Sequence, residues 1–162
     1  MGKIRVLRGQ TNSVQYGGIK QLIQNDSRFN HGFRIKKFVI AYEFPHDPGS
    51  SSRDCFAVLA THADAIPEPN IQQYVWWNWQ DKRQVAWTAT NHIGDSLVEL
   101  YPGLIDPTHV IVRDLYVGIT ALTATGATMF NYYIELEEVE LTENQAVLAI
   151  IQEEAQDAGS AS

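Results

Sequence analysis

Cysteine is almost absent from this chain of 162 residues. Cys55 is the only one, so an internal disulfide is excluded. Long apolar stretches are absent as well: no run approaches the roughly eighteen residues that a membrane-spanning helix requires. Residues 1–8 also lack the uninterrupted apolar core of a secretory signal. We therefore expect a globular protein with no membrane partner.

Clustered metal ligands are also scarce. None of the five histidines forms a His-x-His or His-x-x-x-His pair; they are His31, His46, His62, His92 and His109. Transition metals prefer convergent groups of this kind, so we expect no such metal site and no other cofactor. An interfacial Ca²⁺, bound by loop carboxylates of neighbouring subunits, stays open because oxygen ligands leave weak sequence patterns.

One short motif spells a hydrolase signature. Gly94-Asp95-Ser96-Leu97 resembles the serine block of the GDSL hydrolases, and residues 106–109 supply the Asp-x-x-His of that family. In that family the two blocks lie near opposite ends of an α/β domain, whereas here they are close together in strand-rich sequence. A motif supports catalysis only in the setting that makes its geometry work. We therefore expect no catalytic role for Ser96 or His109, and no enzymatic activity.

Charge is divided sharply along the chain. Residues 1–40 carry eight basic side chains and one acid, for a net charge of +7. The remaining residues carry four bases and eighteen acids, for a net charge of −14, and residues 135–157 hold eight acids without a lysine or arginine. Ends of opposite sign attract each other within one subunit or between neighbouring subunits, so the pattern bears on association rather than on fold.

Period-two alternation of apolar residues dominates the sequence. In residues 34–44, Phe38, Ile40, Tyr42 and Phe44 share one face, which is typical of a strand. Eight such segments occur without interleaved βαβ patterns: 3–8, 34–44, 55–61, 74–79, 84–89, 97–101, 109–122 and 130–136. They predict a single all-β domain over residues 1–162, an antiparallel eight-stranded sandwich of jelly-roll type.

A short helix is expected in the basic N-terminal segment, residues 1–33. Ile19, Leu22 and Ile23 have helical spacing and predict this helix over residues 18–24.

A second helix is expected over residues 142–158. Thr142 and Gln145 form a capping-box pattern at its start, and Val147, Ile150 and Ile151 form an apolar stripe. Its last turns are rich in acids, which the helix dipole disfavours there. This arrangement favours a basic partner outside the helix.

Tryptophans concentrate in residues 74–89, which we interpret as a hairpin with its turn at residues 80–83. Alternate residues of a sandwich strand face inward, so we favour Trp77, Trp79 and Trp87 as core residues and Trp76 as the surface candidate. The alternative is an exposed platform on which sugars or bases stack.

Three features together resemble a known group of proteins: the basic opening with Gly-Gly-Ile-Lys-Gln-Leu-Ile at 17–23, the rhythm of eight strands, and the closing segments 131–137 and 145–151. The chain resembles the small single-jelly-roll capsid proteins of compact non-enveloped viruses, of the type known mainly from environmental small-genome sequences. The resemblance implies a structural subunit of a virion that assembles with itself into a large homo-oligomer enclosing nucleic acid. The chain departs from many such capsids by lacking a long arginine-rich arm.

Two charged sets are the expected contact residues. The basic set is expected to contact nucleic-acid phosphates or a neighbouring subunit, and comprises Lys3, Arg5, Arg8 and Lys20. The acidic set is expected to contact a neighbouring subunit, and comprises Glu153, Glu154 and Asp157. The rival function from another class is a carbohydrate- or ligand-binding β-sandwich that uses the tryptophan-rich hairpin.

Overall fold

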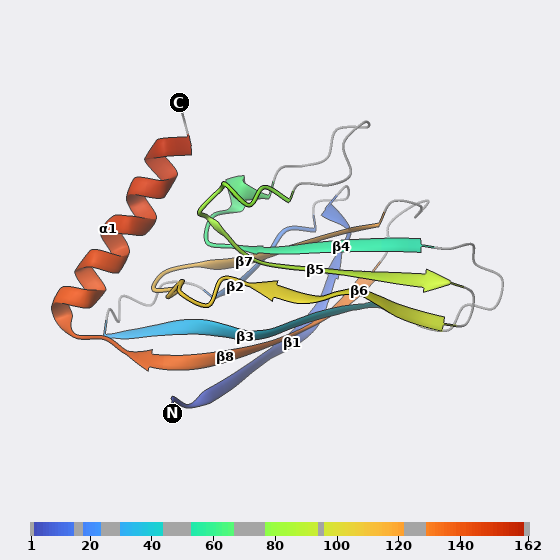
Figure 1. The fold of residues 1–162 in the computed structure, drawn as a ribbon, viewed down its shortest axis with the longest axis horizontal. Helices are drawn as coiled ribbons and strands as arrows, with labels where there is room; N and C mark the ends of the chain where they lie inside the picture. The colour runs from blue at the N-terminus through green and yellow to red at the C-terminus, as the bar shows by residue number, and fades with distance from the viewer. Residues whose placement is uncertain are drawn as a thin grey trace.

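The computed structural model describes residues 2–14, 18–23, 30–43, 53–66, 77–93, 96–121 and 129–160, with the backbone alone at 53, 92–93, 96–102 and 157–160. Two antiparallel sheets and one C-terminal helix make up this part of the chain (Figure 1). The three-stranded sheet has the order β1 (Ile4–Asn12), β8 (Met129–Glu140), β3 (His31–Tyr42). The five-stranded sheet has the order β2 (Lys20–Ile23), β7 (Leu115–Ala121), β4 (Arg53–Ala60), β5 (Gln84–Ile93), β6 (Ser96–Ile105).

Alternate residues of both sheets form the core between them. On β8 every second residue from Phe130 to Leu136 is buried, while the residues between are partly exposed. These side chains pack against the inner face of the five-stranded sheet, where Leu59, Val117 and Ile119 are fully buried. The expected antiparallel β-sandwich is therefore confirmed at this level, because the period-two pattern places one apolar face of each sheet inward.

The two sheets also meet along one edge. Gly103 of β6 has φ 76°, and a Cβ at this position would lie 2.9 Å from the carbonyl oxygen of Phe38 in β3. Glycine is required here on both counts, since it alone adopts this backbone conformation freely and leaves room for the neighbouring strand. β6 therefore lies beside β3 while it pairs with β5.

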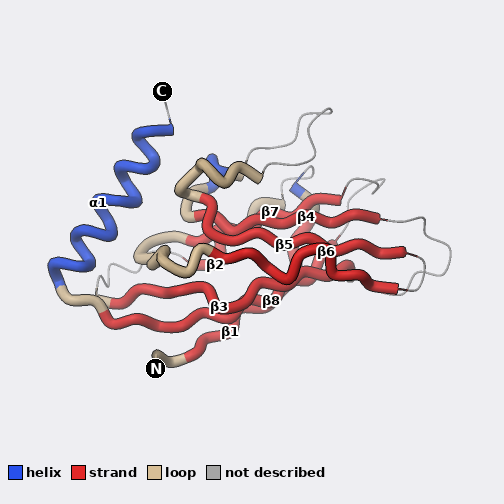
Figure 2. Tube along the Cα trace, viewed as in Figure 1, coloured by secondary structure: helices blue, strands red, loops and turns tan. Residues whose placement is uncertain are grey.

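The C-terminal helix, α1 (Glu143–Ser160), follows β8 directly and confirms the predicted helix. Its start is the expected capping box: the Thr142 amide donates to Gln145 Oε1 at 3.0 Å, and the Gln145 amide donates to Thr142 Oγ1 at 3.4 Å. The helix stands at one end of the sandwich and angles away from the strands (Figure 2). No helix in the described part of the chain is long and apolar enough to span a membrane.

One predicted element is wrong and another is confirmed only in part. The helix expected over residues 18–24 is the strand β2 at 20–23, which pairs with β7. A single turn of apolar residues is too short to form a stable helix, and sheet pairing satisfies the same backbone groups. The strand expected over 109–122 begins only at Leu115, because residues 106–114 form a loop that is bridged to β3 through Phe33 and Ile111.

The predicted tryptophan hairpin is also wrong in its described part. Residues 77–83 contain turns rather than a strand, and β5 pairs with β4 and β6 instead. The segment 67–76, which includes Trp76, lies outside the described residues.

Candidate functional site

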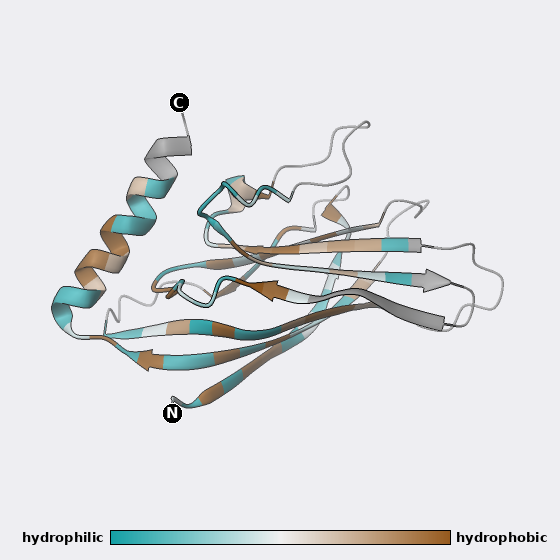
Figure 3. Ribbon diagram, in the orientation of Figure 1, coloured by the Kyte–Doolittle hydropathy of each residue, from teal (hydrophilic) through white to brown (hydrophobic). Residues whose placement is uncertain are grey.

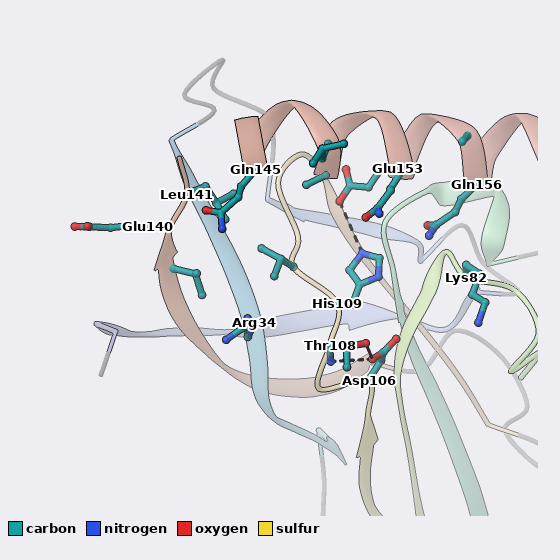
Figure 4. A pocket seen from close by; sticks show the side chains of 16 residues that line it. Arg34, Lys82, Asp106, Thr108, His109, Glu140, Leu141, Gln145, Glu153 and Gln156 are labelled. Carbon is teal, nitrogen blue, oxygen red and sulfur yellow. Dashed lines mark hydrogen bonds and ion pairs between the residues drawn. The ribbon is translucent and has the colours of Figure 1, made fainter. Parts of the chain in front are cut away.

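A cleft of about 800 Å³ lies between α1, the loop 106–114 and the adjoining ends of β3 and β8 (Figure 4). Its polar lining comes from both sides, with Glu153 and Gln156 on the helix and Asp106 and His109 on the loop. The cleft exists because α1 leaves β8 at an angle and contacts the body mainly through small and polar residues. Ala146 and Glu153 are the fully buried residues among those described on this helix.

Glu153 is the central group of the cleft. Its side chain is buried, and its Oε1 accepts a hydrogen bond from the Val112 amide at 3.3 Å. The same oxygen lies 3.8 Å from Nε2 of His109, whose side chain is also largely enclosed. A buried carboxylate requires such partners, so Glu153 ties α1 to the loop.

Asp106 shapes the loop on the opposite side of the cleft. One carboxylate oxygen accepts hydrogen bonds from the Thr108 amide at 2.9 Å and from the Thr108 hydroxyl at 2.7 Å. Burial alone would raise the pKa of Asp106, but the bonds from Thr108 and the nearby His109 outweigh it and lower this pKa. Thr108 is the only hydroxyl among the described lining residues, and it is engaged in this turn.

The hydrolase-like pair is not assembled. Ser96 begins β6, and nine residue steps at about 3.3 Å each put the far end of this strand roughly 25–30 Å away. His109 follows that far end by four residues, so it lies well beyond hydrogen-bond reach of Ser96. Among the described residues, no group of three or more His, Cys, Asp or Glu side chains is placed to hold a metal ion.

The outward face of α1 exposes three large aliphatic side chains. Val147, Leu148 and Ile151 are 50%, 59% and 54% exposed, whereas Glu153 on the opposite face is only 2% exposed. The usual orientation of an amphipathic helix is therefore reversed, with a carboxylate against the body and aliphatic side chains towards solvent. The predicted apolar stripe of Val147, Ile150 and Ile151 is only partly this set: Val147 and Ile151 face outward, Ile150 is half-buried, and the exposure of Leu148 was not predicted.

A second exposed apolar area lies on β1, at the edge of the three-stranded sheet. Ile4 and Val6 are 47% and 45% exposed. They pair with Glu137 and Glu135 of β8, on the face turned away from the core. Hydrophobic residues are visible near the start of β1 and along α1 in Figure 3.

The opposite charges of the chain ends meet inside the subunit. β8 carries acids and lies between β1 and β3, which carry bases. Lys36 Nζ lies 3.5 Å from Glu137 Oε2, and His31 Nδ1 lies 3.4 Å from Glu138 Oε1. Part of the division of charge seen in the sequence is thus satisfied within one sheet.

The four predicted basic contact residues lie in different surroundings. Lys3 and Arg8 are exposed on β1 and its approach. Arg5 is also exposed, with its guanidinium 5.8 Å from the centre of the Phe33 ring. Lys20 Nζ donates to the Gln10 carbonyl oxygen at 3.3 Å and lies over the Tyr132 ring. The structure therefore does not gather them into one patch.

The three predicted acidic contact residues also separate. Glu153 is enclosed within its own subunit, so it is removed from the expected contact surface. Glu154 Oε1 accepts from Arg113 NH1 at 3.2 Å, yet its side chain remains 62% exposed. The side chain of Asp157 lies outside the described residues.

A shallow groove of about 490 Å³ crosses the outward face of the three-stranded sheet next to Arg8 and Tyr133. Lys37 Nζ lies 5.8 Å from the centre of the Tyr133 ring, and the Tyr133 hydroxyl donates to Glu135 at 3.0 Å. This hydrogen bond to the carboxylate raises the pKa of Tyr133 above its ordinary value. The groove is therefore a mixed basic and aromatic surface.

The three described tryptophans differ in burial: two are partly buried and one is exposed. Trp77 Nε1 donates to the Ala57 carbonyl oxygen at 3.2 Å, and Trp87 Nε1 donates to Gln84 Oε1 at 2.9 Å. Both rings are partly buried against a second apolar cluster. Trp79 is 62% exposed and meets Trp87 edge-on at 6.3 Å, so its predicted place in the core is wrong.

No model of a known protein family matches this sequence, and no curated protein matches it.

Proposed function

We propose that this chain is a structural subunit that assembles with copies of itself into a viral shell around nucleic acid, and that its sandwich is a jelly roll. The proposal places the protein in the virion and assigns it no enzymatic role. The observation that carries it is the order in which the strands neighbour one another.

The strands neighbour one another in nested pairs. β1 pairs with β8, β2 with β7, and β4 with β5, while β3 lies beside β6 at Gly103. This nesting is what results when one long antiparallel hairpin of four strands a side rolls up into two sheets. Jelly rolls have eight strands in two sheets, and viral capsid domains are among the proteins that use them.

The surface supports association. Three aliphatic side chains of α1 and two at the edge of the three-stranded sheet are exposed to solvent. Exposing this apolar surface to water is unfavourable for a monomer. Both surfaces lie away from the core, where contacts with neighbours leave the sandwich undisturbed. No cofactor is needed for this role, and an interfacial Ca²⁺ would have to be held by carboxylates of two subunits.

The test is the size of the purified protein. We expect light scattering and negative-stain microscopy to detect closed particles at micromolar concentration, with nucleic acid detected by absorbance at about 260 nm in particles from cells. A protein that remains monomeric at high concentration across salt and pH would overturn the proposal. Screening should include Ca²⁺ and a chelator, so that an ion-dependent shell is not missed.

One observation favours a second candidate function, a carbohydrate- or ligand-binding sandwich. Trp79 presents an exposed indole beside Trp87, and flat exposed rings of this kind stack on sugars. The support is narrower than for the shell, because Trp77 and Trp87 use their indole N–H groups in bonds within the subunit. A glycan array that gives a signal lost in the Trp79→Ala protein would favour this alternative.

A further inference from the structure

We propose that α1 of one copy packs along β1 on the outward face of the three-stranded sheet of a second copy. This inference rests on the proposed self-assembly and deepens it by naming the two surfaces in contact. Three observations carry it: the reversed orientation of α1, the apolar edge of the sheet, and the opposite charges that flank them.

The helix has two opposite faces. At about 100° per residue, Val147, Leu148 and Ile151 fall within one arc of roughly 100°. Ala146 and Glu153, which are buried against the body, point in the opposite direction. The apolar arc is thus the most exposed side of the helix, with Leu148 at the rim of the cleft and Val147 and Ile151 outside it. Its border beside Val147 carries both Glu143 and Glu154, and α1 contains no lysine or arginine.

The sheet offers a matching surface. Ile4 and Val6 are about half exposed, and Arg8 continues the same outward row of β1. Residues 2–14 contain no acid. Across the described outward face of the sheet there are four bases and two acids, namely Arg8, Arg34, Lys36, Lys37, Glu135 and Glu137.

α1 and β1 match each other in length and are complementary in charge. An 18-residue helix is about 27 Å long and a nine-residue strand about 30 Å, so the two elements match in length. Packing them together covers five exposed aliphatic side chains at once and sets helix carboxylates beside sheet cations. Because the contact joins two different surfaces, each copy binds one neighbour through α1 and another through β1, which lets the assembly propagate and close.

Cysteine cross-linking tests the contact directly. The only native cysteine, Cys55, is buried, so single cysteines introduced by Val6→Cys or Leu148→Cys report their own surroundings. We expect a short bis-maleimide to join the two variant proteins when they are co-expressed with different tags. Each variant alone should give no cross-linked dimer. Dimers from Leu148→Cys alone would indicate helix-to-helix contact, dimers from Val6→Cys alone would indicate strand-to-strand contact, and either result, or no adduct, overturns the inference.

A charge introduced on the helix provides the matched comparison. Ile151→Lys, placed in the co-expressed pair, should reduce the yield of the mixed adduct about tenfold because it puts a cation in an apolar contact facing bases. Gln152→Lys adds the same charge on an exposed position outside the apolar arc and should change the yield less than about twofold. Equal yields in the two variants would overturn the inference.

The outcome for the contact is separable from the outcome for the shell. Particles by microscopy without a mixed adduct leave the proposed function standing and overturn the contact. A mixed adduct in a sample that scatters light only as small oligomers supports the contact and overturns the shell.

Discussion

The Val112 amide donates a hydrogen bond to the buried carboxylate of Glu153 at 3.3 Å, across 41 residues of sequence. This bond fastens α1 to the loop before β7, and His109 lies within 3.8 Å of the same oxygen. This polar joint therefore helps to set the position of the helix, and hence the direction of its apolar face, together with the buried Ala146. Breaking the joint should release α1 while leaving the sandwich folded.

The first prediction is that Glu153→Ala loosens α1. Removing the carboxylate leaves the buried Val112 amide without an acceptor. A buried donor without a partner lowers the free energy of unfolding by about 1–3 kcal/mol. Hydrogen exchange of the α1 amides should become faster, while exchange in β4 and β7 stays slow. Glu153→Gln keeps an acceptor oxygen and should be milder, and Glu154→Ala, whose side chain is 62% exposed, should change little. Equal protection of α1 in the alanine variant and the parent protein would contradict the joint.

The second prediction concerns the approach of β6 to β3. Gly103→Ala introduces a Cβ 2.9 Å from the Phe38 carbonyl oxygen at a residue with φ 76°. We expect the free energy of unfolding to fall by about 1–3 kcal/mol in denaturant titrations. The neighbouring Leu104→Ala, at a side chain that is 39% exposed, is the control and should cost less than about 1 kcal/mol. A neutral Gly103→Ala would contradict the close passage on which the nested strand order depends.

Alternation in the sequence predicted most of the strands, because burying one face of a sheet fixes a period of two. β1, β3, β4 and β8 appear near their predicted positions, and the capping box located the start of α1. The short segment 20–23 was misassigned because four residues carry too little periodicity to separate a strand from a helical turn. In such segments the neighbouring strand decides the outcome.

The candidate site was harder to predict. Residue types alone do not reveal that Glu153 faces inward while Leu148 faces outward, because both orientations suit an isolated helix. The position of Glu153, on the helix face opposite Val147 and Ile151, could have indicated an inward-facing carboxylate. The loop residue that binds it, Val112, is 41 residues earlier in the chain, so the sequence pattern does not reveal the contact. Contacts of that separation follow from the three-dimensional path of the strands and not from local pattern.

The third prediction is a pH effect at the turn before β5. Arg83 donates to both oxygens of Asp81, at 2.9 and 2.8 Å, and the pair is mostly shielded from solvent. The hydrogen bond from the Arg83 side chain is the main cause that lowers the pKa of Asp81 below its usual value near 3.8. Because the folded pKa lies below the unfolded one, the carboxylate stabilises the fold above pH 3.8, and this contribution is lost as the pH falls through the folded value.

Asp81→Asn tests this effect. The variant should unfold about 1–2 kcal/mol more easily than the parent protein at pH 7, and the difference should shrink towards pH 3. Asp114→Asn, at a partly exposed carboxylate in the loop before β7, is a comparison in which we expect a smaller difference. A difference for Asp81→Asn that stays constant with pH would contradict the stabilising role of its charge.

The fourth prediction separates the two proposed functions. Trp79→Ala removes an exposed ring that contributes little to the core, so the free energy of unfolding should change by less than about 1 kcal/mol. If the protein is a shell subunit, the size distribution of its particles should be unchanged in light scattering. Trp87→Ala removes a partly buried ring that donates to Gln84, so it should destabilise the fold more strongly. It is the comparison for the loss of a ring that supports the fold. Loss of glycan binding in Trp79→Ala with intact stability would favour the ligand-binding alternative.

The last prediction addresses the basic residues of β1 and its approach. The triple variant Lys3→Ala/Arg5→Ala/Arg8→Ala removes three exposed cations that contact nucleic acid in one version and a neighbouring subunit in the other. Of the three, only Arg8 lies in the outward row of β1 with Ile4 and Val6. We favour the subunit contact because the four predicted bases do not form the dense patch that binds phosphates strongly.

The triple variant should therefore assemble several-fold less at low salt, with little change in nucleic acid per assembled subunit. High salt should loosen the parent protein in the same way even without nucleic acid, since about 1 M salt screens charges beyond roughly 3 Å. Lys82→Ala, which removes an exposed cation far from β1 in sequence, serves as the control for loss of positive charge. A selective loss of bound nucleic acid with normal assembly would instead assign these residues to phosphate contact. Normal assembly with unchanged nucleic acid would contradict both versions, and the apolar residues Ile4 and Val6 would then be the only remaining basis for a contact at this edge of the sheet.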